Sequence, residues 1–129
     1  AGGAALAITI RLQSFGRKYG VPEAELVLDV RCLDNPFWVP ELKSMSGLDA
    51  PVRDYVFRTE ESRRFAALLL ELLKLQAELS EKHGRRELFV AVGCTGGRHR
   101  SVAVAEYLAE ELAADGAAVT VTHRDIEKG

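Results

Sequence analysis

Runs of β-branched and aliphatic residues, separated by turn-forming residues, predict four β-strands in this chain. The strands are expected at Ala5–Gln13, Leu26–Arg31, Leu88–Val92 and Ala118–Thr122. The first alternates Ile with Thr, and the fourth is strongly β-branched. The third, LFVAV, is apolar throughout, as is typical of a strand that is covered on both faces of a sheet.

Between these strands, apolar residues recur with the helical period. The longest helix is expected at Thr59–Lys82, which begins at a Thr in the N-cap position, has acidic residues in its first turn and stops before Gly84. Its apolar face is expected to consist of Phe65, Leu68, Leu69, Leu72, Leu73 and Leu79. A second helix is expected at Ser101–Asp115, ending at Gly116, and a further short helix at Pro51–Phe57.

The order of these elements indicates the fold class. Strands that alternate with helices imply βα units, so we expect an α/β domain with a four-stranded, mostly parallel sheet flanked by helices. No internal repeat, low-complexity tract or linker divides the chain, and 129 residues is a normal length for one core. Residues 1–129 are therefore expected to form a single domain.

Composition and charge restrict the class of protein, its cellular location and the partners that it can bind. With 47% hydrophobic and 28% charged residues the chain is typical of soluble globular proteins, and no apolar run approaches the ~20 residues of a membrane span. The start, AGGAAL, lacks a signal-peptide pattern and a Met, which suggests a cut or processed end. Two cysteines, Cys32 and Cys94, cannot form a secreted-type disulfide framework, so we expect a cytoplasmic protein. The net charge of −2 argues against a nucleic-acid-binding surface.

Cationic and hydrogen-bonding residues follow each predicted strand. In an open parallel sheet, ligands bind outside the carboxyl ends of the strands. The four segments are Ser14–Gly20, Arg31 with Asn35–Trp38, Gly93–Ser101 and His123–Asp125, and we expect them to converge on an anion site. Outside the third segment, the expected ligand-binding residues are Ser14, Gly16, Lys18, Asn35, Phe37 and Arg124. Trp38 and Phe37 could form the floor of a sugar pocket, although core packing is the more common role of a Trp.

The third segment, GCTGGRHRS, predicts a phosphate cradle. Gly96 and Gly97 allow a tight turn whose backbone N–H groups, with that of Thr95, face a ligand. Ser101 begins a helix whose positive end faces the same space, and Arg100 can grip phosphate oxygens in a bidentate manner. Arg98 and His99 are expected to add anion contacts. Two glycines alone would indicate an ordinary strand-to-helix turn, and the cationic residues with the helix start favour the cradle.

The same segment matches Cys-x5-Arg-Ser and is similar to the protein-tyrosine-phosphatase signature. In that chemistry the thiolate, here Cys94, attacks phosphorus while loop amides and an arginine, here Arg100, hold the oxygens. No general acid stands at a diagnostic position, since Asp34, Asp49 and Asp125 are each possible. A buried structural cysteine is the competing interpretation. A cysteine-dependent phosphatase therefore stays an alternative to a binding domain that is not an enzyme and has no catalytic residue.

Five stretches together resemble a known family: SFGRKYG (14–20), LDVRCLDNPFW (28–38), MSGLDAPV (45–52), GCTGGRHRSV (93–102) and HRDIEK (123–128). They resemble the C-terminal domain of the RNase adapter protein RapZ and its YvcJ-like relatives, and they cover nearly the whole chain. The resemblance implies an α/β domain that binds glucosamine-6-phosphate and, in enterobacterial members, small regulatory RNAs that control amino-sugar synthesis. Full-length members also have an N-terminal nucleotide-binding domain with a Walker-type loop, and no G-x4-G-K-[ST] occurs here.

The resemblance also assigns roles to residues. Thr95, Gly96, Gly97 and Arg100 correspond to the family's sugar-phosphate loop, which Cys94, Arg98 and His99 share. Two features depart from the family: Phe37 stands where a ligand-contacting His is expected, and the chain ends without a strongly basic tail. RNA binding by this domain alone is therefore not expected, although an RNA-binding adapter module is a further alternative.

Together these observations predict a sensor or adapter domain for a phosphorylated small molecule, such as a sugar phosphate, in amino-sugar regulation. Neither a cofactor nor a metal ion is expected, nor is contact with a membrane. Homo-oligomerisation is compatible with the sequence.

Overall fold

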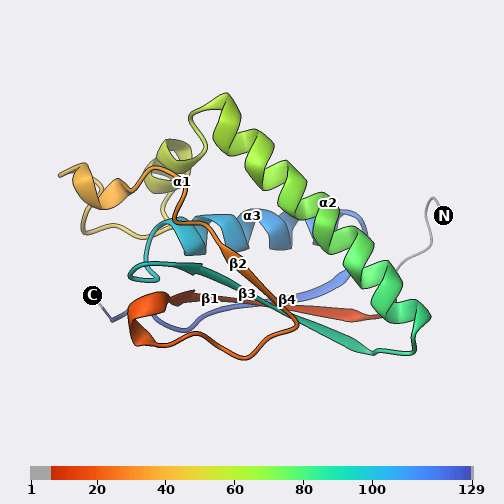
Figure 1. Cartoon of the computed structure of the whole chain (residues 1–129). Helices are drawn as coiled ribbons and strands as arrows, with labels where there is room; N and C mark the ends of the chain where they lie inside the picture. Colours follow the sequence, from red (N-terminus) through yellow and green to blue (C-terminus); the bar gives the residue numbers. More distant parts are fainter. Residues whose placement is uncertain (1–6, 129) are drawn as a thin grey trace.

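Four parallel strands form one sheet, in the order β2-β3-β1-β4 (Figure 1). The computed structural model describes residues 7–128. The strands are β1 (Thr9–Gly16), β2 (Leu26–Asp29), β3 (Glu87–Cys94) and β4 (Ala118–His123). The predicted single α/β domain with a four-stranded sheet is confirmed, and the sheet is parallel throughout.

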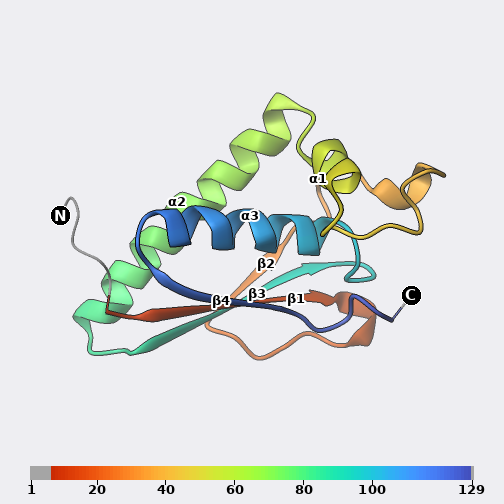
Figure 2. The same ribbon diagram turned by 180° about the vertical axis from the view of Figure 1, so that it is seen from behind.

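The helices lie on the same side of this sheet, as Figures 1 and 2 show from opposite directions. They are α1 (Ala50–Val56), α2 (Glu60–Lys82) and α3 (Arg100–Ala114), with 3-10 turns η1 (Arg17–Tyr19) and η2 (Pro36–Trp38) after the first two strands. α3 packs on β1, β3 and β4, and α2 packs on α3. No helix between residues 7 and 128 is long and apolar enough to cross a membrane.

The strands differ from the prediction mainly at their ends. β1 begins later and ends later than predicted, so Ser14 and Gly16 belong to the strand and not to the loop after it. Residues 5 and 6 of the predicted strand lie outside the described part of the chain. β1 extends to Gly16 because it continues to pair with β3 up to that residue, with Phe15 opposite Gly93. A Cβ on Gly93 would stand 2.3 Å from the Phe15 ring, so this glycine makes room for the buried aromatic side chain.

The core lies between α3 and the sheet. Ile10, Leu12, Leu88, Val90 and Val92 point into it from the central strands and are at most 1% exposed. As predicted, β3 is covered on both faces, because only Phe89 and the first residue, Glu87, are not buried in it. Each buried large side chain stabilises the fold by about 1.5–3 kcal/mol, so these residues fix the sheet under α3.

α2 begins as predicted, since the side chain of Thr59 accepts a hydrogen bond from the Ser62 N–H. Its predicted apolar face is only partly right: Leu73 is fully buried and Phe65 and Leu69 pack against the core, but the other three leucines are exposed. The buried apolar residues are Ala66, Leu70, Leu73 and Ala77, whereas Leu68, Leu72, Leu75 and Leu79 are 43–60% exposed. The leucine-rich sequence offers two apolar faces, and the face that includes two alanines packs inward because small side chains let α2 approach its neighbours closely.

Candidate functional site

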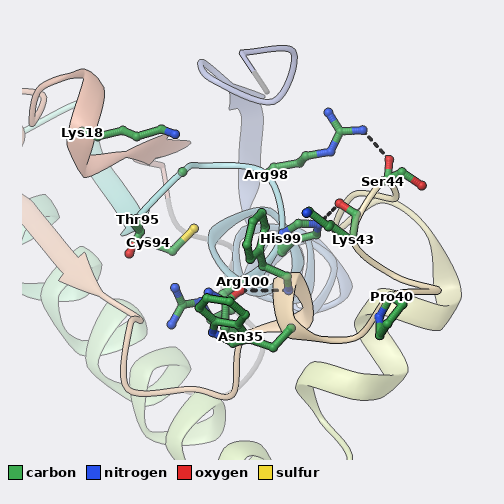
Figure 3. A pocket seen from close by; sticks show the side chains of 13 residues that line it. Lys18, Asn35, Pro40, Lys43, Ser44, Cys94, Thr95, Arg98, His99 and Arg100 are labelled. Carbon is green, nitrogen blue, oxygen red and sulfur yellow. Dashed lines mark hydrogen bonds between the residues drawn. The ribbon is translucent and has the colours of Figure 1, made fainter.

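A cavity of about 770 Å³ opens where the carboxyl ends of β1, β2 and β3 meet (Figure 3). Three of the four predicted segments contribute to it, as does the segment that leads from η2 toward α1. Its lining residues are Lys18, Asn35, Phe37, Trp38, Pro40, Lys43, Ser44, Cys94, Thr95, Gly96, Arg98, His99 and Arg100. Four of them are cationic at neutral pH and none of those described is acidic, so the cavity is suited to an anion.

Arg100, at the first turn of α3, is only 6% exposed. Its NH1 group donates to the carbonyl oxygens of Arg31 (2.8 Å) and Leu33 (3.1 Å). These bonds hold the guanidinium against the segment that follows β2. Its Nε–H is buried and has no hydrogen-bond partner in residues 7–128. An unsatisfied buried donor of a charged group costs at least about 1–3 kcal/mol, and an acceptor supplied by a ligand would remove that cost.

Cys94 ends β3 and is 2% exposed. Its Sγ lies 3.1 Å from the Ser101 hydroxyl oxygen and accepts the Gly97 N–H at 3.3 Å. Ser101, predicted to begin the helix, is its second residue and is fully buried. Ser101 and the amide of Gly97 thus face the sulfur atom and do not line the cavity.

Close backbone contact explains two of the glycines. Gly97 has a φ of +79°, and a Cβ there would stand 2.5 Å from the Gly16 nitrogen. A Cβ on Gly16 would stand 2.5 Å from the carbonyl of Gly96. Gly96 itself faces open space, where a missing side chain leaves the cavity free. The turn after β3 is therefore pressed against the end of β1, and its position is fixed.

Asp125 also stabilises the end of β1, next to the turn after β3. It is fully buried and accepts the Gly16 N–H at 2.7 Å, while Arg124 and Lys128 donate to it, each at 2.8 Å. Burial alone would raise its pKa, but hydrogen bonds from Arg124, Gly16 and Lys128 outweigh it and hold the pKa at about 2. Arg124, predicted to contact the ligand, is engaged here and with the carbonyl of Gly20, away from the cavity lining.

Arg98 and His99 line the cavity, but their polar groups bind backbone carbonyls. The Arg98 guanidinium donates to Ser44, Met45 and Ile126. His99 Nε2 lies 3.1 Å from the carbonyl oxygen of Lys43, and burial lowers the pKa of this imidazole, which favours its neutral form at pH 7. Both residues therefore hold the cavity wall together.

Ser14, predicted to contact the ligand, is not among the residues that line the cavity. It is fully buried, and its hydroxyl lies 2.7 Å from His123 Nδ1, whose Nε2 lies 2.7 Å from Glu106.

Between residues 7 and 128, no group of three His, Cys, Asp or Glu side chains could hold a metal ion.

Sequence reasoning missed part of the cavity wall. Trp38, for which core packing was favoured over the floor of a pocket, is 77% exposed and lines the cavity, in edge-to-face contact with Phe37 at 5.1 Å between ring centroids. Pro40, Lys43 and Ser44 were not singled out, and Lys43 Nζ lies 4.6 Å from the centroid of the Phe37 ring. A usable signal existed for Trp38, because Asn35-Pro36 before it favours a turn, and connecting segments lie mostly at the surface.

Comparisons with known proteins identify the family of this chain. A nucleotide-binding protein of Clostridium acetobutylicum is 47% identical over 122 residues, which are 94% of this chain and 42% of that relative. A nucleotide-binding protein of Geobacter sulfurreducens is 50% identical over 123 residues, 95% of this chain and 43% of the relative. The chain thus spans less than half the length of these relatives. The model of the RapZ C-terminal domain matches residues 8–127, and the chain belongs to the RapZ C-terminal domain family.

Proposed function

We propose that the cavity binds a phosphorylated small molecule, glucosamine-6-phosphate or a related sugar phosphate, and that the domain acts as a sensor or adapter in amino-sugar regulation. The observation that supports this most is the cavity lining, in which four of the described residues are cationic and none is acidic. Arg100 is one of the four, and its buried Nε–H lacks a partner among residues 7–128. A phosphate oxygen would satisfy this donor, and the charge-assisted hydrogen bond would be stronger than a neutral one.

The anchored position of Arg100 favours binding further. Because two carbonyls already hold its NH1 group, little side-chain freedom is lost when a ligand arrives. The start of α3 adds the positive end of a helix dipole, and Lys18 and Lys43 add charge at the cavity wall. The exposed rings of Phe37 and Trp38 offer apolar surface for the carbon skeleton of a sugar.

A thermal-shift titration tests this proposal, with glucosamine-6-phosphate, glucose-6-phosphate and inorganic phosphate as probes. A ligand at ~100 times its dissociation constant should stabilise the domain by about 2.7 kcal/mol. Arg100→Lys keeps the charge and removes the Nε–H, so it should reduce the stabilisation strongly. The matched control is Arg53→Lys, because Arg53 pairs with Glu110 outside this cavity.

Arg100 also tethers the segment after β2, so Arg100→Lys can weaken the fold as well as binding. Lys43→Ala separates the two effects. Lys43 is exposed, and its carbonyl, which binds His99, is retained in the variant. This variant should unfold at the wild-type temperature without ligand and show weaker ligand stabilisation. Unchanged stabilisation in both cavity variants, or none in the wild type with any of the three probes, would refute the proposal.

A cysteine-dependent phosphatase is the second candidate, and the contacts of Cys94 with Ser101 and the Gly97 amide favour it. These groups can stabilise a thiolate at the start of α3. The thiolate would attack phosphorus, the alcohol or phenol oxygen would leave, and water would then hydrolyse the phosphocysteine. Because the described lining has no carboxylic acid to protonate a leaving group, p-nitrophenyl phosphate is the appropriate probe. Release of p-nitrophenolate that disappears in Cys94→Ser would favour the enzyme, and ligand binding without turnover would favour the sensor.

A further inference from the structure

The cationic side chains of the cavity lining have no acidic partners. They are Lys18, Lys43, Arg98 and Arg100. Between residues 7 and 128, no carboxylate forms an ion pair with any of these four, whereas eight other lysines and arginines in that range are paired. The groups that hold Arg98 and Arg100 are backbone carbonyls, which accept hydrogen bonds but carry no net charge. A phosphate monoester supplies only about −1.5 to −2 at pH 7, so the cavity favours a ligand with more negative charge than one phosphate group.

Lys43 is a cationic position of its own, because its anchors differ from those of Arg100. Its Nζ lies 4.6 Å from the centroid of the Phe37 ring, and its carbonyl oxygen lies 3.1 Å from His99 Nε2. Both ends of the residue are therefore held. The Arg100 guanidinium is held instead by two carbonyls of the segment after β2. Figure 3 shows the two residues on different segments of the wall, Arg100 at the start of α3 and Lys43 beside Ser44.

We propose that Lys43 binds a second anionic group of the ligand, so that the cavity takes a sugar phosphate with a further phosphate or carboxylate group. This inference rests on the phosphate site proposed above at Arg100 and narrows its ligand class. With one phosphate at Arg100 and the carbon skeleton against Phe37 and Trp38, the other end of the skeleton comes to the ring beside which Lys43 Nζ lies. An ammonium is a compact charge with three donors, which suits a phosphate or a carboxylate equally.

Isothermal titration calorimetry near pH 7.5, at a constant physiological ionic strength, tests the second anion. The ligands are glucose-6-phosphate, glucose-1,6-bisphosphate and 6-phosphogluconate. The wild type should bind one of the two doubly anionic ligands about tenfold or more tightly than glucose-6-phosphate, because a hydrogen bond between two charged groups is gained. Tighter binding of glucose-1,6-bisphosphate would identify the second group as a phosphate, and tighter binding of 6-phosphogluconate would identify it as a carboxylate.

Variants of two lining lysines locate the contact. Lys43→Gln should bring the ratio of the dissociation constants close to one, and Lys43→Arg should keep most of it. Because Lys43 is exposed, both variants should unfold at the wild-type temperature without ligand. Lys18→Gln is the matched comparison, since it removes the same charge from another segment of the lining. It should weaken all three ligands and leave the ratio nearly unchanged, whereas a general attraction of anions would lower the ratio equally in Lys18→Gln and Lys43→Gln.

The outcomes separate this inference from the proposed function. Equal affinity of the wild type for the three ligands would overturn the second anion and leave the phosphate site at Arg100 standing. A ratio that falls as far in Lys18→Gln as in Lys43→Gln would also overturn it, because no particular contact with Lys43 is then needed. Absence of binding by all three ligands would refute the phosphate site and, with it, this inference.

Discussion

Asp125 offers a sharp test of how the site is held together. Its carboxylate is fully buried and joins the end of β1, through the Gly16 N–H, to two cations of the C-terminal turn, Arg124 and Lys128. Asp125→Asn keeps the size and shape of the side chain and removes its charge. Gly16 can still donate to the amide oxygen, but both cations lose the charge that they neutralise.

The magnitude follows from the pKa of Asp125, which falls from 3.8 to about 2 in the folded protein. One pKa unit corresponds to about 1.4 kcal/mol, so the ionised carboxylate contributes on the order of 2 kcal/mol to stability. Since the folded-state pKa is depressed, this contribution is fully present above pH 4 and is lost as the pH falls toward 2. Asp29 serves as the comparison, because its pKa is also lowered to about 2, by hydrogen bonds from Arg31, although the side chain is 44% exposed. Solvent screens that pair, and exposed ion pairs contribute only about 0–1 kcal/mol.

The assay is urea denaturation of the wild type, Asp125→Asn and Asp29→Asn between pH 2 and pH 7. At pH 7, Asp125→Asn should lower the free energy of unfolding by about 2 kcal/mol and Asp29→Asn by under about 1 kcal/mol. Below pH 4 the wild type should lose stability faster than Asp125→Asn, and the two curves should converge. Equal effects of the two substitutions, or curves that stay parallel through pH 2–4, would show that the ionised Asp125 carboxylate does not stabilise the fold in the way argued above.

Three further predictions concern single positions. Gly97→Ala should cost at least about 1–2 kcal/mol in thermal unfolding, because φ is +79° and a Cβ would stand 2.5 Å from the backbone of β1, whereas Gly96→Ala should be nearly neutral. Leu73→Ala should cost about 2–5 kcal/mol in denaturation, since Leu73 is fully buried, and Leu72→Ala under about 0.5 kcal/mol in dilute solution; equal losses would contradict the orientation of α2. Burial lowers the pKa of His99, so the wild type should lose stability as the pH falls below 6.5, and His99→Gln should reduce this loss when unfolding is followed from pH 7 to 5.

Local periodicity predicted the elements of this fold well, because strand and helix patterns are properties of short segments. The orientation of α2 could not be predicted in the same way. Leu69, Leu70, Leu72 and Leu73 lie on several sides of one helix, so hydrophobicity alone allows more than one buried face. Packing decides between them, since Ala66 and Ala77 let the helix lie close to its neighbours. That information belongs to the partner surface and is absent from the helix sequence.

The site shows the same division between local and tertiary information. The rule that ligands bind at the carboxyl edge located the cavity, because it depends only on strand direction. The rule does not show which basic residue of the loop is available to a ligand. The sequence predicted Arg98 as an additional anion contact beside Arg100, but its guanidinium donates to the carbonyls of Ser44, Met45 and Ile126. These acceptors lie far from Arg98 along the chain, in segments without regular structure that the sequence does not place.

Arg100 unites these observations, because the two sides of its guanidinium have different neighbours. NH1 binds the carbonyls of Arg31 and Leu33, while Nε–H is buried and has no partner between residues 7 and 128. The same side chain thus fixes the segment that leads to Phe37 and Trp38 and offers a donor to an anion. A ligand at Arg100 would then be held between the turn after β3 and the aromatic residues after β2. A change that breaks the hydrogen bonds between Arg100 NH1 and these two carbonyls should therefore weaken ligand binding, even if it removes no direct contact with the ligand. Such a loss would distinguish a preorganised site from one that only carries positive charge.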